Sequence, residues 1–264
     1  MENISFLQRL VNLFFTPSKA FDGYQDGVSY RDWLYPLIIV TVSLYILPQF
    51  YRDISFYEAD QRLTKIERSI ANNPDLPEDR KVEIMDGMSE AREKVSDAQE
   101  NPLAFRNMWG YLIMPVMLFV MTAFFAAILL LIGNFGMGGK ATFFQMFSVV
   151  MLTYLISGNG IFMNMIPGVG TLELLVKTPL IIIKESTDML LSPGLLFDEI
   201  DSFFKEFLNQ LDAFRIWGMV VMGFGFAKLY GKSTASGIVA VAIPWLILVS
   251  IGAAMLRANG MFAG

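Results

Sequence analysis

Long apolar runs alternate with polar connections along this chain of 264 residues. Four runs of about 20 residues or more carry no charged side chain, and they cover residues 33–51, 107–139, 141–172 and 234–256. An α-helix of about 20 apolar residues crosses a hydrocarbon core of roughly 30 Å, so each run predicts a transmembrane helix. A fifth run, 216–227, is shorter, but Arg215 and Lys228 beside it can keep their charges at the two membrane surfaces. The pattern predicts an all-α, polytopic membrane protein with five transmembrane helices.

The segment before the first run, residues 1–32, predicts helices that lie in the membrane interface. Its apolar side chains recur at helical spacing, at Ile4, Leu7, Leu10, Val11 and Phe14. Arg9 and Asn12 interrupt the apolar sequence, and no small-residue cleavage site follows, so a signal peptide is not predicted. Thr16 and Pro17 then predict the cap and first residue of a second short helix.

Residues 52–106 form a charged segment between the first two predicted spans. The turn sequence NNPDLPED separates two stretches of helical composition, which predicts a two-helix hairpin with arms of about 25 to 35 Å. Each arm has a thin apolar stripe, made by Leu63, Ile66, Ile70, Val82, Met85, Met88 and Val95. We interpret the stripe as a contact for a protein partner or for a second copy. The alternative is a solvated spacer.

Residues 173–213 predict a second surface element, because the apolar stretch 178–183 is too short to cross a membrane. Pro193 and Gly194 break the chain, and an amphipathic helix with an acidic polar face follows. An acidic face is repelled by anionic lipid, which favours protein contact through Phe204, Phe207 and Leu211. The alternative is that this helix only caps the bundle.

The charges of the short loops predict the orientation. Lys140 lies in one connection, Lys228 and Lys232 lie in another, and neither connection contains an acid. Basic loops stay in the cytoplasm, which places the N-terminus there and the C-terminus outside. The hairpin and the acidic amphipathic helix are then extracytoplasmic.

Composition excludes several chemistries. Cys and His are absent, so thiol nucleophiles, Cys or His metal sites and serine–histidine triads are excluded. A net charge of −5 gives no support to nucleic-acid binding. The sequence GMGGK lacks the spacing of a phosphate loop. We expect no cofactor, no metal and no catalytic activity.

One polar cluster lies inside a predicted span, at Asn159 and Asn164 in LISGNGIFMNMIPG. It could line an intramembrane binding site at a broken helix, or it could make ordinary hydrogen bonds between helices. The interiors of the five predicted spans contain no ionisable residue, which argues against a coupled carrier.

Several motifs occur in order along the chain: LFFTPSKAF, DWLYPLI, GGKATFFQMFSVV and LNQLDAFRIWGMVVMGFGFAKLYGKSTASGIVA. Together they resemble the Yip1-type membrane family, with matching positions at Pro17, Gly138, Gly139, Lys140, Leu211, Asp212, Phe214 and Trp217. The resemblance implies five spans and a cytosolic N-terminus. Residues 52–106 and 173–212 depart from the compact form of that family.

The resemblance also implies a non-catalytic role. Eukaryotic members are trafficking scaffolds of the Golgi and endoplasmic reticulum, and some bacterial members are accessory subunits beside MacB-like ABC transporters with periplasmic adaptor proteins. We therefore expect a scaffold or accessory subunit in a bacterial inner membrane. The alternatives are a small-molecule or lipid-handling protein that uses residues 159–168, or a membrane-trafficking factor.

Overall fold

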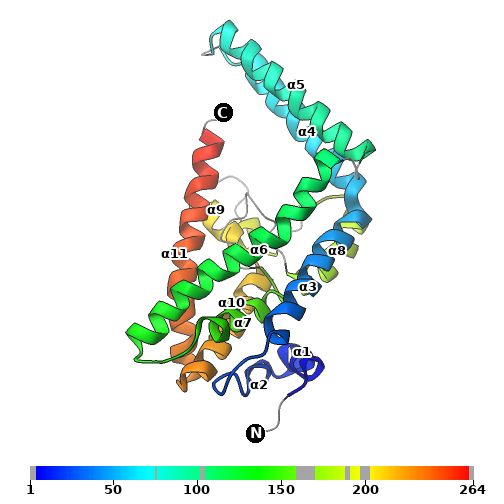
Figure 1. Cartoon of the computed structure of the whole chain (residues 1–264). Helices are drawn as coiled ribbons and strands as arrows, with labels where there is room; N and C mark the ends of the chain where they lie inside the picture. Colours follow the sequence, from blue (N-terminus) through cyan, green and yellow to red (C-terminus); the bar gives the residue numbers. More distant parts are fainter. Residues whose placement is uncertain are drawn as a thin grey trace.

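The computed structural model describes residues 4–74, 76–101, 105–158, 170–187, 191–196 and 203–261. These residues are helical apart from their connections, and none of them forms a β-strand. The helices form a bundle with a two-helix arm at one end and the N-terminus at the other (Figure 1). In chain order the helices are α1 (Phe6–Phe15), α2 (Pro17–Ala20), α3 (Arg31–Ile46), η1 (Leu47–Tyr51), α4 (Arg52–Ala71), α5 (Glu78–Glu100), α6 (Phe105–Leu131), η2 (Ile132–Gly136), α7 (Phe143–Thr153), α8 (Thr171–Lys184), η3 (Pro193–Leu196), α9 (Phe203–Gln210), α10 (Ala213–Tyr230) and α11 (Thr234–Met261).

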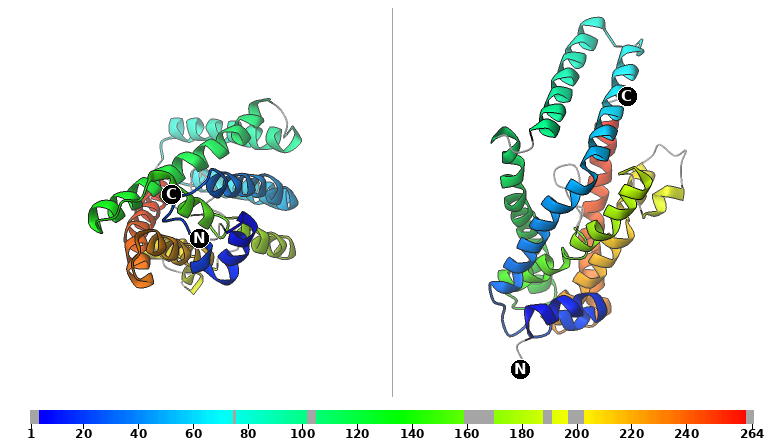
Figure 2. Two further views of the ribbon diagram at one scale, coloured as in Figure 1. Left: turned by 60° about the horizontal axis from the view of Figure 1, so that its bottom comes forward. Right: turned by 90° about the vertical axis from the view of Figure 1, so that its right-hand side faces the viewer.

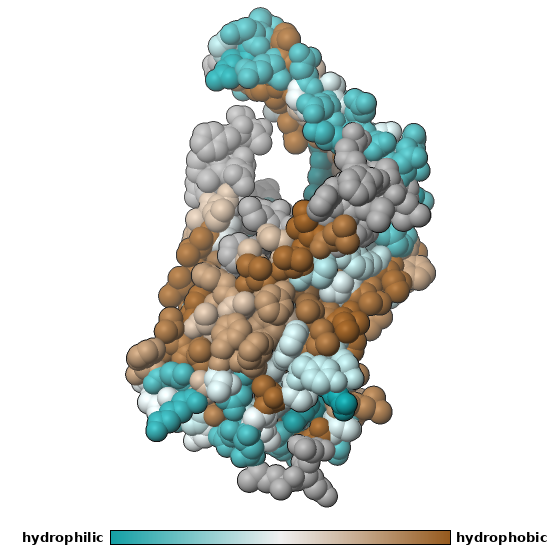
Figure 3. Space-filling view, viewed as in Figure 1, coloured by the Kyte–Doolittle hydropathy of each residue, from teal (hydrophilic) through white to brown (hydrophobic). Residues whose placement is uncertain are grey.

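Three helices in the described part of the chain are long and apolar enough to cross a membrane: Arg31–Ala71, Leu112–Gly136 and Thr234–Met255. They overlap the predicted runs 33–51, 107–139 and 234–256. On the face shown in Figure 3, an apolar region separates a hydrophilic base from the hydrophilic arm. The protein is therefore a multi-pass helical membrane protein.

The first span does not end where its apolar run ends. The chain stays helical through η1 into α4, and only Tyr51 at their junction departs from helical dihedral angles, with φ −124° and ψ 21°. The first span and the first arm of the hairpin are thus one long helix.

The run 141–172 is not one continuous helix, which corrects the sequence prediction. α7 ends at Thr153, and its 11 residues are about 16 Å long at 1.5 Å per residue, too short to cross alone. The backbone N–H groups that open α8 donate to carbonyls just after α7: Thr171 to Tyr154 at 3.3 Å, Leu172 to Leu155 at 2.9 Å and Glu173 to Ile156 at 3.1 Å.

These bonds join the two short helices end to end. In an α-helix each N–H donates to the carbonyl four residues earlier in the chain. At this joint each N–H donates instead to a carbonyl 17 residues earlier. A Cβ atom on Gly170 would lie 2.4 Å from the Cα of Ser157, so this close meeting requires glycine. The stretch 178–183, predicted as an isolated surface piece, belongs to α8, which continues from the joint.

α7 forms the centre of the core. Every residue from Gln145 to Gly158 is buried, and α7 packs against α3, α6 and α10. Its N-terminus is fixed by a capping box between Thr142 and Gln145. The Gln145 amide also donates to the backbone carbonyl of Tyr24 at 2.7 Å, which ties α7 to the N-terminal segment.

The N-terminal helices α1 and α2 lie under the bundle, at the end opposite the hairpin (Figure 2). Arg9 of α1 points inward, where it pairs with Asp32 at 3.2 Å and lies over the Tyr24 ring. Burial raises the pKa of the Tyr24 phenol, and the nearby carboxylate of Asp32 raises it further. The positive charge of Arg9 lowers this pKa, but by less. Apolar side chains of α1 face outward instead, at Leu7, Val11, Phe14 and Phe15. A charged interior and an apolar exterior suit a helix at a lipid surface.

Candidate functional site: a buried ion network at a helix break

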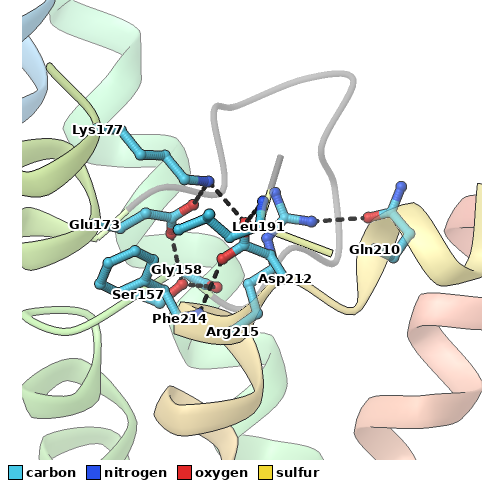
Figure 4. Close-up of polar contacts among 9 residues, drawn as sticks. All are labelled: Ser157, Gly158, Glu173, Lys177, Leu191, Gln210, Asp212, Phe214 and Arg215. Carbon is cyan, nitrogen blue, oxygen red and sulfur yellow. Dashed lines mark hydrogen bonds and ion pairs between the residues drawn. The ribbon is translucent and has the colours of Figure 1, made fainter. Parts of the chain in front are cut away.

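Four charged side chains meet where α8 begins and α10 begins (Figure 4). Glu173 lies in the first turn of α8, and Lys177 follows one helical turn later on the same face. Asp212 is the N-cap of α10, and Arg215 lies in its first turn. Glu173 and Asp212 are 0% and 1% exposed, and Arg215 is 6% exposed. Two acids and two bases therefore share one enclosed site.

Lys177 connects the two carboxylates. Its Nζ lies 2.7 Å from Glu173 Oε1 and 2.9 Å from Asp212 Oδ2. Arg215 donates through Nη1 to Gln210 Oε1, 3.0 Å away at the end of α9. Because the formal charges of the four ionic groups cancel, the network leaves no net charge in the bundle.

Hydrogen bonds extend the network to the helix break. The Ser157 hydroxyl donates to Glu173 Oε2 at 2.7 Å, which links the residues after α7 to the first turn of α8. Asp212 accepts two backbone N–H groups as well, from Phe214 at 2.9 Å and from Leu191 at 3.2 Å. A single carboxylate thus caps α10, binds Lys177 and holds the chain before α9.

The geometry makes this network a lock between helices. Taking charges out of water costs free energy, and close partners with additional hydrogen bonds offset that cost. If one partner is removed, the remaining charges stay buried without compensation, which costs roughly 3 to 5 kcal/mol. The network therefore fixes how α8 and α10 meet.

This site was not predicted from the sequence. All four charged residues fall in a predicted surface segment or at the edge of a predicted span. The spacing of Glu173 and Lys177 was a readable signal for an ion pair on one helix face, but Asp212 lies 35 positions after Lys177. The predicted polar site at Asn159 and Asn164 lies outside the described residues, which end at Gly158 on this side of the break.

The residues of the predicted partner-contact stripe of the hairpin do not share one environment, because some are buried and others are exposed. Ile70 and Met88 are each 8% exposed, and α4 and α5 lie side by side. Val82 is 59% exposed, and Met85 and Ile66 are also exposed. The remaining members, Leu63 and Val95, are half-buried.

Ion pairs hold the two arms together. Arg92 of α5 reaches Asp60 at 2.9 Å and Glu67 at 3.0 Å on α4, and it donates to Thr64 Oγ1 at 3.0 Å. Arg52, at the base, donates to the backbone carbonyl of Gln99 at 3.1 Å.

The base of the hairpin is attached to the far end of α8. Glu58 accepts from the Ser186 hydroxyl at 2.7 Å and from the backbone N–H of Thr187 at 3.0 Å, and the Thr187 hydroxyl binds its second oxygen. Glu185 ends α8 in the left-handed conformation, with φ +52°. α8 therefore has the ion network at its start and the hairpin base at its end.

The apolar residues predicted on the acidic amphipathic helix are mostly packed. Phe207 and Leu211 lie against the bundle core, and α9 packs on α11. Phe204 is 54% exposed. Two of the three residues predicted to bind a partner thus contribute to the bundle itself.

A helical bundle with several long apolar helices is typical of a multi-pass membrane protein. Comparison with known proteins gives its family. The Yip1 domain model matches residues 11–256, so the chain belongs to the Yip1 family. This confirms the family resemblance found in the sequence. No curated protein and no solved structure gives a significant match.

The structure gives physical reasons for several of the family-like positions. Pro17 is the first residue of α2, where its missing N–H costs nothing. A Cβ on Gly139 would lie 2.2 Å from the Tyr230 ring, so glycine is required there. Asp212 is the cap and ion partner described above, and Trp217 is exposed on α10.

Proposed function

We propose that this Yip1-family protein is a non-catalytic membrane subunit that organises a larger assembly and contacts its partner through the α4–α5 hairpin. One observation carries the proposal: the hairpin projects past the apolar region of the bundle while its base is attached to α8 (Figures 1 and 3). An element that projects and is anchored at its base can transmit a partner's position to the bundle.

The surface of the hairpin supports a protein partner. Tyr57 is 66% exposed and Val82 59% exposed on helices that are otherwise strongly charged. Tyrosine is among the residue types that carry most of the binding energy at protein interfaces, and burial of Val82 would add apolar contact. The arms bury little between themselves, so a partner would add the apolar contact that they lack.

The resemblance implies the kind of partner. We propose a bacterial inner membrane location, with the N-terminus cytoplasmic and the hairpin and C-terminus outside, as the basic short loops favour. The partner is then an ABC transporter with its periplasmic adaptor. A second copy of this chain is the alternative occupant of the hairpin.

The test is extraction in mild detergent followed by size separation and mass spectrometry of the bound proteins. Replacing the exposed pair, Val82→Ser with Met85→Ser, should reduce the recovered partner about tenfold, because two apolar contacts are lost. Glu93→Gln, an exposed change on the same helix, is the matched control and should leave recovery unchanged. Equal recovery from the double variant and the control would sink the proposal.

A second candidate function uses the helix break. Discontinuous membrane helices often surround a binding site, and here charged groups lie beside Gly158. A small-molecule or lipid-handling protein would then depend on the adjoining residues. Replacing Asn159 and Asn164 with leucine separates the two candidates: an organising subunit should keep its partner, whereas a substrate-handling protein should lose ligand binding.

A further inference from the structure

An apolar groove opens between η2, together with the residue that follows it, and the start of α11. These segments lie at the end of the bundle opposite the hairpin (Figure 1). Its volume is about 500 Å³, within the range of small-molecule sites. Gly136 has no side chain and those of Ala235 and Ala240 are small, and a Cβ on Gly136 would meet no atom within 4 Å. The groove is therefore open above Gly136.

Larger apolar side chains border this space. Val239 and Ile243 of α11 are 56% and 57% exposed, and Ile132 and Met137 lie opposite them. In a membrane-spanning helix such surfaces face lipid, so an acyl chain rather than water would fill the groove.

The wall on the α6 side is rigid. Tyr230 donates to Asn134 Oδ1 at 3.1 Å, and the Asn134 amide is held by the backbone of Ala141 at 2.9 and 3.0 Å. The Tyr230 ring fills the space beside Gly133 and Gly139, where a Cβ would lie 2.0 and 2.2 Å from ring atoms. These contacts hold η2, a π-helical turn, in place on one side of the groove.

Two lysines lie close in sequence to the residues that line the groove. Lys140 follows Met137 by three positions, and Lys232 precedes Ala235 by three. Both lysines are exposed, and among the described residues neither makes an ion pair, whereas Lys228 is paired with Asp22 at 2.7 Å. The connections 132–142 and 228–236 contain no acidic residue.

We propose that this groove binds one anionic phospholipid, with an acyl chain between η2 and α11 and the phosphate headgroup at Lys140 and Lys232. The apolar space, the rigid wall and the two unpaired lysines are separate observations that fit the two parts of one amphipathic ligand. The site is distinct from the ion network and from the hairpin, so it does not depend on the function proposed above.

The probe is phosphatidylglycerol with a photoreactive group in its acyl chain, placed in phosphatidylcholine vesicles that contain the full chain. We expect crosslinks on residues 132–137 and 235–243, and competition by unlabelled phosphatidylglycerol but not by additional phosphatidylcholine. Equal competition by both lipids would mean ordinary boundary lipid and would overturn the proposal. So would a crosslinked second copy of the chain across the groove.

Variants separate the two halves of the site. Lys140→Gln with Lys232→Gln should weaken the preference for phosphatidylglycerol about fivefold per lysine and leave the crosslinked positions unchanged. Gly136→Leu should fill the groove and remove crosslinks from both lipids. Gly252→Leu, at a glycine of α11 that also has open space around it, is the matched control and should change neither. If Gly136→Leu leaves crosslinking intact, the acyl chain lies elsewhere; the wild-type competition decides the question even if a variant fails to insert.

Discussion

Lys177 bridges two carboxylates inside the bundle, and we call this the inner bridge. Arg92 bridges two carboxylates on the hairpin, and we call this the outer bridge. The Lys177 side chain is 12% exposed and both of its partners are 1% exposed. Arg92 is 40% exposed, and its partners Asp60 and Glu67 are 52% and 23% exposed. The distances are nearly equal, between 2.7 and 3.0 Å, so the two bridges differ in their cation and in how deeply they are buried.

The surroundings decide what each bridge can do. Exposed ion pairs contribute roughly 0 to 1 kcal/mol because water and salt screen them. A buried bridge is hardly screened, and its charges have no alternative partner such as water. The inner bridge therefore sets the geometry of the helix break, whereas the outer bridge only favours closed arms. A partner can separate the hairpin arms at little cost.

The largest effect should follow from removing the inner cation. Lys177→Met keeps the length of the side chain but leaves Glu173 and Asp212 buried beside each other without a shared counter-ion. We expect a loss of about 3 to 5 kcal/mol in the free energy of unfolding, measured by thermal unfolding in detergent. Lys184→Met, an exposed lysine on the same helix, is the control. A loss below about 1 kcal/mol would show that the network is not a lock.

A smaller loss should follow from neutralising the shared carboxylate. Asp212→Asn retains an oxygen that can accept the Phe214 N–H, but it removes the charge that faces Lys177. We expect about 2 to 3 kcal/mol of destabilisation, because a charge-assisted hydrogen bond is weakened while the cap remains. Asp212→Ala removes the cap as well and should cost about 1 kcal/mol more. Equal unfolding temperatures for the two variants would contradict the capping role.

Hydropathy predicted the parts of the fold that lipid solvates. The runs 107–139 and 234–256 overlap two long helices because nearly every residue in them is apolar, whichever way it faces. The joint between α7 and α8 could not be predicted in this way. It is made by backbone hydrogen bonds, which leave no periodic signal. The local traces are the glycine at position 170 and the sequence LISGNGIFMNMIPG before it, which allowed a broken helix without predicting how the two helices join.

Periodicity likewise identified apolar positions without identifying their contacts. Ile70 and Val82 were predicted on one partner-contact stripe, yet Ile70 is buried and Val82 is exposed. Which of them faces the other arm depends on how two helices pack, and this is set by pairs such as Arg92 with Asp60 that lie 32 positions apart. Asp212 was noticed as a motif residue, but its link to Lys177 required the bundle.

Loss of the attachment at the hairpin base should have an effect on stability between those expected for the inner and the outer bridge. Glu58→Ala removes the acceptor for Ser186 and Thr187, and should cost about 1 to 2 kcal/mol locally, since hydrogen bonds to a charged group are lost at a half-buried site. Hydrogen exchange should become faster at the start of α4 and at residues 186 and 187, and remain unchanged in α7. Asp53→Asn, exposed on the same helix, is the control. Unchanged exchange would mean that the hairpin is not anchored through Glu58.

The smallest effect on stability should follow from weakening the outer bridge. The salt dependence of hydrogen exchange is the most sensitive measurement of it. Raising the salt concentration from about 0.1 M to about 1 M shortens the screening length from about 10 Å to about 3 Å. Exchange of the α4 and α5 amides should accelerate, while α8 and α10 stay protected because both carboxylates that Lys177 bridges are buried. Arg92→Gln should cost at most about 1 kcal/mol and should remove the salt dependence of the hairpin alone. If high salt loosened both regions equally, the inner network would be solvated, and the contrast between the two bridges would fail.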